Sequence, residues 1–254
     1  MRAALVIHQV VPGIEANLAA MEASIGEAAD AGAGLVLFPE AALTGLINND
    51  DPAHDLPLGQ PIPGPATERV GAAARQHSLW IATGLLERDG DTLFDSAVLL
   101  GADGEMKLHY RRIQPQWHGH SADPRVYRQG DRIVVAASPF GRIAFLICGD
   151  LFDDGIVARL RDAKPDLLLF PFARNFGDGS FDQARWDREE EPAYATRAAL
   201  TGCLTLMVNA LEDRAPTEWP AFGGAMVVAP QGDILARHPL GHPGVLRHRG
   251  NPPS

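Results

Sequence analysis

The spacing of apolar residues along the chain changes repeatedly between two patterns. Over residues 14–31 apolar side chains recur every three or four positions, which predicts an amphipathic helix. The short apolar runs on either side, 3–10 and 33–38, have the length and composition of buried strands. The same alternation of apolar runs and helical spacing returns in the second half of the chain.

Turn residues separate these segments and complete the expected order of elements. Further strands are expected at 79–86, 92–100, 105–110, 132–137, 142–147, 167–170, 203–209, 226–229 and 233–236, and further helices at 67–77, 156–162 and 189–201. Two halves of alternating strands and helices predict an α/β sandwich with a mostly parallel or mixed sheet core and helices outside. No linker or short repeat divides the chain, so we expect one domain over residues 1–248 and a disordered tail at 249–254.

Charge and composition narrow the classes of partner. The formal net charge of −10 argues against a nucleic-acid or anionic-membrane partner, since both require a basic surface. No apolar run approaches the ~20 residues of a membrane span, and residues 1–7 do not resemble a signal peptide. A cytoplasmic protein is therefore expected. The two cysteines form no C-x-x-C pair, which argues against a cysteine-based zinc or redox site.

Two apolar runs end in residues that can carry chemistry. The run at 143–147 ends at Cys148, which is followed by Gly149 and Asp150, and the run at 35–39 ends at Glu40. The carboxyl ends of strands are where open α/β sheets build their sites, and a thiol beside a carboxylate suggests a nucleophile and its base. A simple buried cysteine is the alternative at position 148, and Asp150 could cap the turn. The second cysteine, Cys203, is expected to be a small buried residue.

Five segments, taken together, resemble a known family. The segments lie at 38–45, 110–112, 147–151, 196–209 and 223–232. In their order and spacing they resemble the characteristic segments of the nitrilase or carbon–nitrogen hydrolase superfamily. The resemblance implies a four-layer α–β–β–α sandwich that associates into a homodimer or larger homo-oligomer and needs no metal or organic cofactor. It also implies hydrolysis of a non-peptide carbon–nitrogen bond in a small linear amide or N-carbamoyl compound, through a cysteine thioester.

The resemblance also implies a role for individual residues. Cys148 would be the nucleophile and Glu40 the general base, and the Gly149 N–H would help to bind the oxyanion. At the position where the family carries a catalytic lysine, this chain has Arg112, which keeps its charge, is bulkier and is expected to pair tightly with Glu40. Asp123 stands where the family often has a second, supporting carboxylate.

The sequence leaves open the roles of several further residues and an alternative function. Trp117, Phe172 and Asn175 are candidates for the lining of a substrate pocket, although plain packing is the favoured explanation for each of them. His118 and His120 have a spacing that suits a metal, but no acidic partner lies at a defined interval, so a solvated loop or a substrate contact is favoured. Because arginine replaces lysine, the alternative function is a catalytically silent nitrilase-fold protein that binds a small molecule or a protein partner. Substrate specificity is expected to reside in loops 47–64, 113–131 and 174–188.

Overall fold

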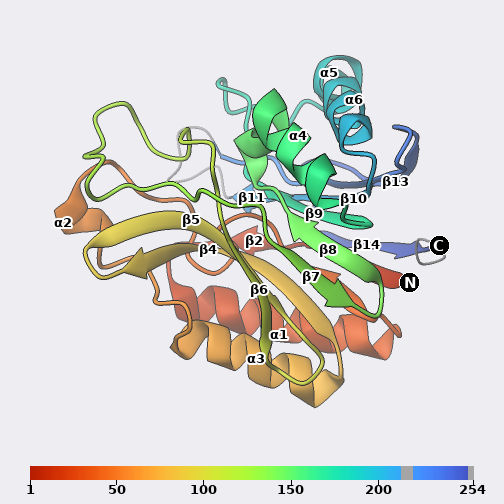
Figure 1. The fold of residues 1–254 in the computed structure, drawn as a ribbon, viewed down its shortest axis with the longest axis horizontal. Coiled ribbons are helices and arrows are strands. Elements are labelled where there is room, and N and C mark those ends of the chain that lie inside the picture. Colours follow the sequence, from red (N-terminus) through yellow and green to blue (C-terminus); the bar gives the residue numbers. More distant parts are fainter. Residues whose placement is uncertain (213–219, 251–254) are drawn as a thin grey trace.

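A computed structural model describes residues 1–212 and 220–250 and has four layers, helix, sheet, sheet and helix (Figure 1). Helices α1 (Ile14–Asp30) and α3 (Pro65–His77) cover the outer face of the first sheet. Helices α4 (Asp154–Ala163) and α6 (Glu191–Thr201) cover the second sheet on the opposite side of the molecule. The four-layer α–β–β–α sandwich expected from the sequence is confirmed.

Each large sheet has six strands. The first has the order β14-β1-β3-β4-β5-β6, made of β14 (Gly244–Arg249), β1 (Arg2–Ile7), β3 (Leu35–Leu37), β4 (Trp80–Asp89), β5 (Thr92–Leu100) and β6 (Met106–Arg111). The second has the order β13-β12-β10-β9-β8-β7, made of β13 (Ile234–His238), β12 (Ala225–Val228), β10 (Leu204–Asn209), β9 (Leu167–Phe172), β8 (Gly141–Phe145) and β7 (Val135–Ser138). In both sheets three central strands are parallel and the outer pairs are antiparallel, so each sheet is mixed.

Strand β1 shows how the apolar pattern builds two cores. Leu5 and Ile7 belong to the large cluster between the sheets, whereas Ala4 and Val6 pack with the residues of α1 and α3. Successive side chains of a strand point to opposite faces, so a strand that is buried on both faces must be apolar throughout. This is why the central strands read in the sequence as continuous apolar runs rather than as alternating ones.

Several boundaries differ from the predicted ones. Strand β9 continues through Pro171 to Phe172, although a proline cannot donate a ladder hydrogen bond and was expected to end it. Loop 47–64 contains the short helix α2 (Pro52–Asp55). Strand β14 was not predicted at all; it pairs antiparallel with β1 and ends at Arg249, the first residue of the expected tail. Residues 251–254 of that tail lie outside the described residues.

The remaining short elements lie between the main ones. They are the two-stranded sheet of β2 (Gln9–Val10) and β11 (Leu211–Glu212), the 3₁₀ turn η1 (Cys148–Phe152), helix α5 (Gln183–Arg185) and the π-helical turn η2 (Trp186–Glu190). Across residues 1–212 and 220–250, none of the helices has the length and apolar character needed to cross a membrane.

Candidate active site

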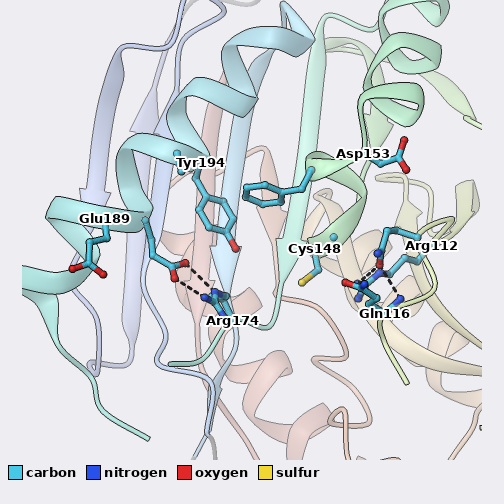
Figure 2. Close-up of a pocket in the computed structure, with 12 residues that line it drawn as sticks. Arg112, Gln116, Cys148, Asp153, Arg174, Glu189 and Tyr194 are labelled. Carbon is cyan, nitrogen blue, oxygen red and sulfur yellow. Dashed lines mark hydrogen bonds and ion pairs between the residues drawn. The ribbon is translucent and has the colours of Figure 1, made fainter. Parts of the chain in front are cut away.

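A cavity of about 660 Å³ opens where η1, the segment after β6 and the loop after β9 meet (Figure 2). Three residues that the sequence singled out, Cys148, Gly149 and Arg112, line it. Its other lining residues are Gln114, Gln116, Phe152, Asp153, Arg174, Glu189, Glu190, Ala193 and Tyr194. The cavity therefore has one wall around the cysteine and a second wall formed by α6 and the residues before it.

Cys148 stands at a sharp turn just beyond the end of β8. Its φ angle of 46° lies in the left-handed region, which costs a non-glycine residue roughly 1–3 kcal/mol and is concentrated at functional sites. The turn exposes part of the side chain to the cavity, whereas the preceding Ile147 is fully buried. The sulfur points into the cavity (Figure 2).

Asp150 holds this turn against the segment that carries Arg112. One carboxylate oxygen, Oδ2, accepts hydrogen bonds from the Ile147 N–H at 3.0 Å and from the Tyr110 hydroxyl at 2.8 Å. The other, Oδ1, accepts from the backbone N–H groups of Ile113 and Gln114 at 3.1 and 2.8 Å. Burial raises the pKa of Asp150, and these hydrogen bonds oppose that shift. Asp150 thus caps the cysteine turn, the alternative that the sequence suggested for it.

Glu40 reaches the site from the first sheet, directly after β3. The following residue, Ala41, also has a left-handed backbone, with φ 48°. This turn packs directly on β4 at Gly84, where an added Cβ would lie only 2.6 Å from the backbone nitrogen of Ala41. Only glycine allows this close approach, so a residue of β4 determines where the Glu40 carboxyl lies.

Arg112 joins two buried carboxyl groups. Its Nη1 donates to Oε1 of Glu40 at 2.9 Å and to Oδ2 of Asp95 at 3.3 Å, while Nη2 donates to Oε1 of Gln114 at 3.2 Å. The side chains of Arg112, Glu40 and Asp95 are at most 3% exposed. The expected pairing of Arg112 with Glu40 is therefore present, and a second carboxyl shares the same nitrogen.

The environment of Glu40 strongly favours its protonated form. Burial raises the pKa of Glu40 to about 8, and the nearby Cys148 sulfur adds to the shift when it is charged, whereas Arg112 opposes it. A carboxylate whose pKa lies this close to that of a thiol can exchange a proton with it near neutral pH. The pair can therefore work as an acid and a base.

Gly149 lies in direct contact with the guanidinium. A Cβ built on Gly149 would lie 2.7 Å from Nη2 of Arg112 and 2.7 Å from Oε1 of Gln114. Any larger residue would have to displace one of these two groups. The glycine after the cysteine thus lets the arginine reach the wall of the cavity beside the thiol.

The opposite wall of the cavity carries a charged pair that the sequence analysis did not identify. Arg174 donates from Nε and Nη2 to the two carboxylate oxygens of Glu190 at 2.9 and 2.5 Å, and the Tyr194 ring lies beside this pair (Figure 2). The Arg174 side chain is 40% exposed, so the pair is accessible from the cavity. Arg174 follows β9 at its carboxyl end, the same signal that pointed to Glu40 and Cys148.

Besides the buried Glu40, four of the site residues expected from the sequence do not line this cavity. Asp123 forms a bidentate pair with Arg125 at 2.7–3.1 Å, because an arginine two residues away in the same loop captures it, so the expectation that Asp123 lies beside the catalytic group is wrong. The buried carboxyl beside Arg112 is Asp95, from strand β5. A carboxylate within the apolar run 93–100 was the available signal.

The other three have structural roles. Trp117 is buried in a small cluster with Leu86, Leu93 and Tyr127. Phe172 packs against Trp186 and Tyr194 and lines a smaller cavity of about 210 Å³. Asn175 offers its backbone carbonyl to Arg174 at 2.7 Å. Packing, the alternative considered for each of them, accounts for the contacts of Trp117 and Phe172.

In the part of the chain that the structure describes, no group of three or more His, Cys, Asp or Glu side chains is arranged to hold a metal ion. His118 instead shares hydrogen bonds with the Gly119 carbonyl and with Gln129.

The fold brings a cysteine to a cavity and a buried carboxyl close to its sulfur, the arrangement of a nucleophile beside a base. The family profile described as carbon-nitrogen hydrolase matches residues 2–248, and the chain belongs to that family. It is 28% identical over 233 residues to a deaminated glutathione amidase of Yersinia enterocolitica, covering 88% of this chain and 77% of that protein. It is 25% identical over 260 residues to a bifunctional nitrilase/nitrile hydratase of Lupinus angustifolius, covering 87% and 69%.

Solved structures share the fold. An amidase from Nesterenkonia sp. superposes with a TM-score of 0.78 at 22% identity, covering 97% of this chain and 89% of that one. A carbon-nitrogen hydrolase from Helicobacter pylori G27 gives a TM-score of 0.82 at 17% identity, covering 97% and 88%. In a mutant of the Nesterenkonia amidase, acrylamide has added to the active-site cysteine.

Proposed function

We propose that this chain is an amidohydrolase that cleaves a carbon–nitrogen bond in a small linear amide or N-carbamoyl compound through a thioester on Cys148. One observation carries the proposal. The Cys148 sulfur opens into a cavity of about 660 Å³, and the buried Glu40 lies close enough for the charge of that sulfur to raise its pKa. A nucleophile, a base and space for a small substrate are thus in one place.

The reaction would follow from the proton that Glu40 and Cys148 exchange. Glu40 takes the thiol proton as the sulfur attacks the carbonyl carbon, and it returns this proton to the nitrogen as the carbon–nitrogen bond breaks. Ammonia or an amine leaves, and the acyl group remains on Cys148 as a thioester. Glu40 then takes a proton from a water molecule that attacks the thioester, and the acid product leaves as the thiol is restored.

Arg112 and the Gly149 N–H are proposed to stabilise the oxyanion of the tetrahedral intermediates. The contact between Gly149 and Nη2 of Arg112 supports this role, since it brings a fixed positive charge beside the thiol. Arginine stays protonated throughout the accessible pH range. Arg112 would therefore supply charge and hydrogen bonds, and Glu40 would carry every proton.

An amide is favoured over a nitrile as the substrate. The relative with the higher identity of the two described above is named an amidase, and the cavity carries polar side chains, among them the accessible Arg174–Glu190 pair on the wall opposite the cysteine. The alternative, a silent binding protein, is not favoured, because Cys148 lines the cavity and the buried Glu40 lies near its sulfur.

We also propose the homodimer that the family resemblance implied, formed through the helical layer of α4 and α6. Two large apolar side chains on that side, Phe152 and Leu200, are 46% and 45% exposed. Burial of such side chains stabilises association, at about 25 cal/mol per Å² of apolar surface removed from water. Sedimentation of the wild type and of Leu200→Glu tests this: a wild-type monomer would contradict it.

The enzymatic proposal is tested by ammonia release from a panel of small amides and N-carbamoyl compounds. Cys148→Ala should abolish turnover while the protein stays folded, because losing one sulfur leaves only a small cavity. The matched control is Cys203→Ala, since Cys203 is buried and its sulfur contacts the Pro165 carbonyl, away from the cavity. Full activity in Cys148→Ala would rule out covalent catalysis by this thiol.

A further inference from the structure

Glu40 and Asp95 are two buried carboxyl groups that share a single guanidinium nitrogen. Nη1 of Arg112 lies 2.9 Å from Oε1 of Glu40 and 3.3 Å from Oδ2 of Asp95. The second oxygen of each carboxyl, Oε2 of Glu40 and Oδ1 of Asp95, is buried and has no hydrogen-bond partner among the described residues. Buried acceptors without a donor are costly, and the two carboxyl groups lie within hydrogen-bonding reach of each other, so a proton on one of them would lower that cost.

The charges of Glu40, Asp95 and Arg112 also indicate that one of the two carboxyl groups carries a proton. If both carboxyls were ionised, two negative charges would meet one positive charge, and Cys148 would be the next ionisable group facing them. Two carboxyls that share a buried site raise the pKa of one another, so one of them keeps its proton to a higher pH. A proton shared between the Asp95 and Glu40 carboxyl groups would supply the donor that these unpaired oxygens lack.

We propose that Asp95 is a positioning residue that remains protonated at neutral pH and donates its O–H to Glu40, which holds the Glu40 carboxyl toward Cys148. This inference rests on the proposed function, because it assigns Asp95 a part in that reaction. With Asp95 neutral, Glu40 and Cys148 share one further proton and carry one negative charge between them. Arg112 balances that charge, so Asp95, Glu40, Cys148 and Arg112 are neutral when counted together.

Asp95, rather than Glu40, is the residue that keeps its proton because of its surroundings. It lies within strand β5, and the ionisable groups that face it are Glu40 from the turn after β3 and Arg112 from the segment after β6. Cys148 and Asp150 of η1 lie beyond these two. Burial raises the pKa of Asp95 well above its ordinary value, and the neighbouring Glu40 raises it further.

The experiment uses Asp95→Asn in a Cys203→Ala background, so that Cys148 is the only thiol. Asparagine can still donate to Glu40 and accept from Arg112, but it cannot ionise. The readout is the rate of alkylation of Cys148 by iodoacetamide as a function of pH, which needs no substrate. We expect the pH midpoint of Asp95→Asn to match that of the Cys203→Ala parent, because a neutral group replaces a neutral group.

An ionised Asp95 would behave differently. Removing a negative charge beside Cys148 would then move the alkylation midpoint to lower pH by about 1–3 units, and such a shift would overturn the proposal. Asp89→Asn is the matched control, since Asp89 is a 63% exposed carboxylate of the same sheet that pairs with Arg111; it should leave the midpoint unchanged. Asp95→Ala, which removes the donor, should lower kcat at least tenfold, and an unchanged kcat in this variant would also refute the role.

A second measurement detects the proton on the carboxyl directly, first in the wild type and then in the conservative variant. Infrared spectroscopy of the wild type at neutral pH should contain the carbonyl stretch of a protonated, buried carboxylic acid, and Asp95→Asn should lose that intensity. Absence of the band in the wild type, or its full retention in Asp95→Asn, would contradict the assignment. Because neither readout requires turnover, a protein with the expected band and midpoint but no ammonia release would refute the proposed function and leave the protonated Asp95 established.

Discussion

Replacing Arg112 with lysine changes the one position at which the family resemblance implied a different residue. The guanidinium donates three hydrogen bonds from two nitrogens: Nη1 to Glu40 and Asp95, and Nη2 to Gln114. A lysine has a single nitrogen on a thinner side chain. It can keep the contacts of Nη1 at best, and it loses the contact of Nη2 beside Gly149.

The structure allows the size of the effect to be worked out. Loss of one hydrogen bond from a charged group costs about 1.5–3 kcal/mol, and each 1.4 kcal/mol that is lost only in the transition state lowers the rate tenfold. If Nη2 contacts the oxyanion, as proposed, loss of one such donor typically costs ~10²–10³-fold in kcat. We therefore expect Arg112→Lys to lower kcat at least tenfold, and by ~10²–10³-fold if the lysine cannot reach the oxyanion.

The assay is ammonia release by both proteins against the same panel of amides, with kcat and KM determined separately. Arg111→Lys is the matched control: it is the adjacent residue, but its guanidinium pairs with Glu87 and Asp89 instead of lining the cavity. We expect the control to retain the wild-type kcat. Turnover that appears only in Arg112→Lys, with an inactive wild type, would refute the reasoning and indicate a site silenced by its arginine.

Three further predictions concern the residues around the thiol. Gly149→Ala should lower kcat at least tenfold with little change in melting temperature, because its Cβ would lie 2.7 Å from Nη2 of Arg112; wild-type kcat would contradict that contact. The pKa of Glu40, about 8 in the folded protein, lies above its ordinary value of 4.5, so the folded state favours the protonated carboxyl. The contribution of Glu40 to the free energy of unfolding is therefore fully present below about pH 4.5 and is lost as the pH rises through 8. The melting temperature of Glu40→Gln should therefore rise relative to that of the wild type between pH 5 and pH 9. A difference in melting temperature that stays constant over this pH range would refute the prediction. Asp150→Asn should destabilise the fold by about 2–5 kcal/mol in urea unfolding, since its amide N–H₂ would face the Ile147 N–H and the Tyr110 O–H from which Asp150 accepts; a loss below about 0.5 kcal/mol would count against this prediction.

The candidate site divides into residues that the sequence could reveal and residues that it could not. Glu40 and Cys148 were found because each ends an apolar run, and the carboxyl end of a strand lies at the edge of its sheet whatever the neighbouring strands are. Arg174 carries the same signal after β9 but was passed over. Asp95 lies in the interior of β5, where a single polar residue in a strand can equally well face solvent.

Asp123 illustrates the opposite error. Its place in the chain, upstream of Gly130 and Asp131, fitted the family pattern, but spacing does not determine which charge a loop carboxylate will meet. In the folded protein Arg125 is nearer, and the pair stays on the loop. The sheet that brings β5 beside β4 and β6 supplies a different carboxyl to Arg112.

The order of the main helices and strands, the two-halved α/β plan, and the positions of the nucleophile and base candidates could be predicted from the amino-acid sequence. They follow from local periodicity and from where apolar runs stop, which depend on neighbours along the chain. The sequence did not predict that β14 completes the first sheet, that Asp95 shares Arg112 with Glu40, or that the Arg174–Glu190 pair lines the cavity of Cys148; these contacts exist only in the folded protein. The physical reason is that the burial, charge partner and pKa of a side chain are set by groups that are distant in sequence, and only the packing of the two sheets brings those groups together.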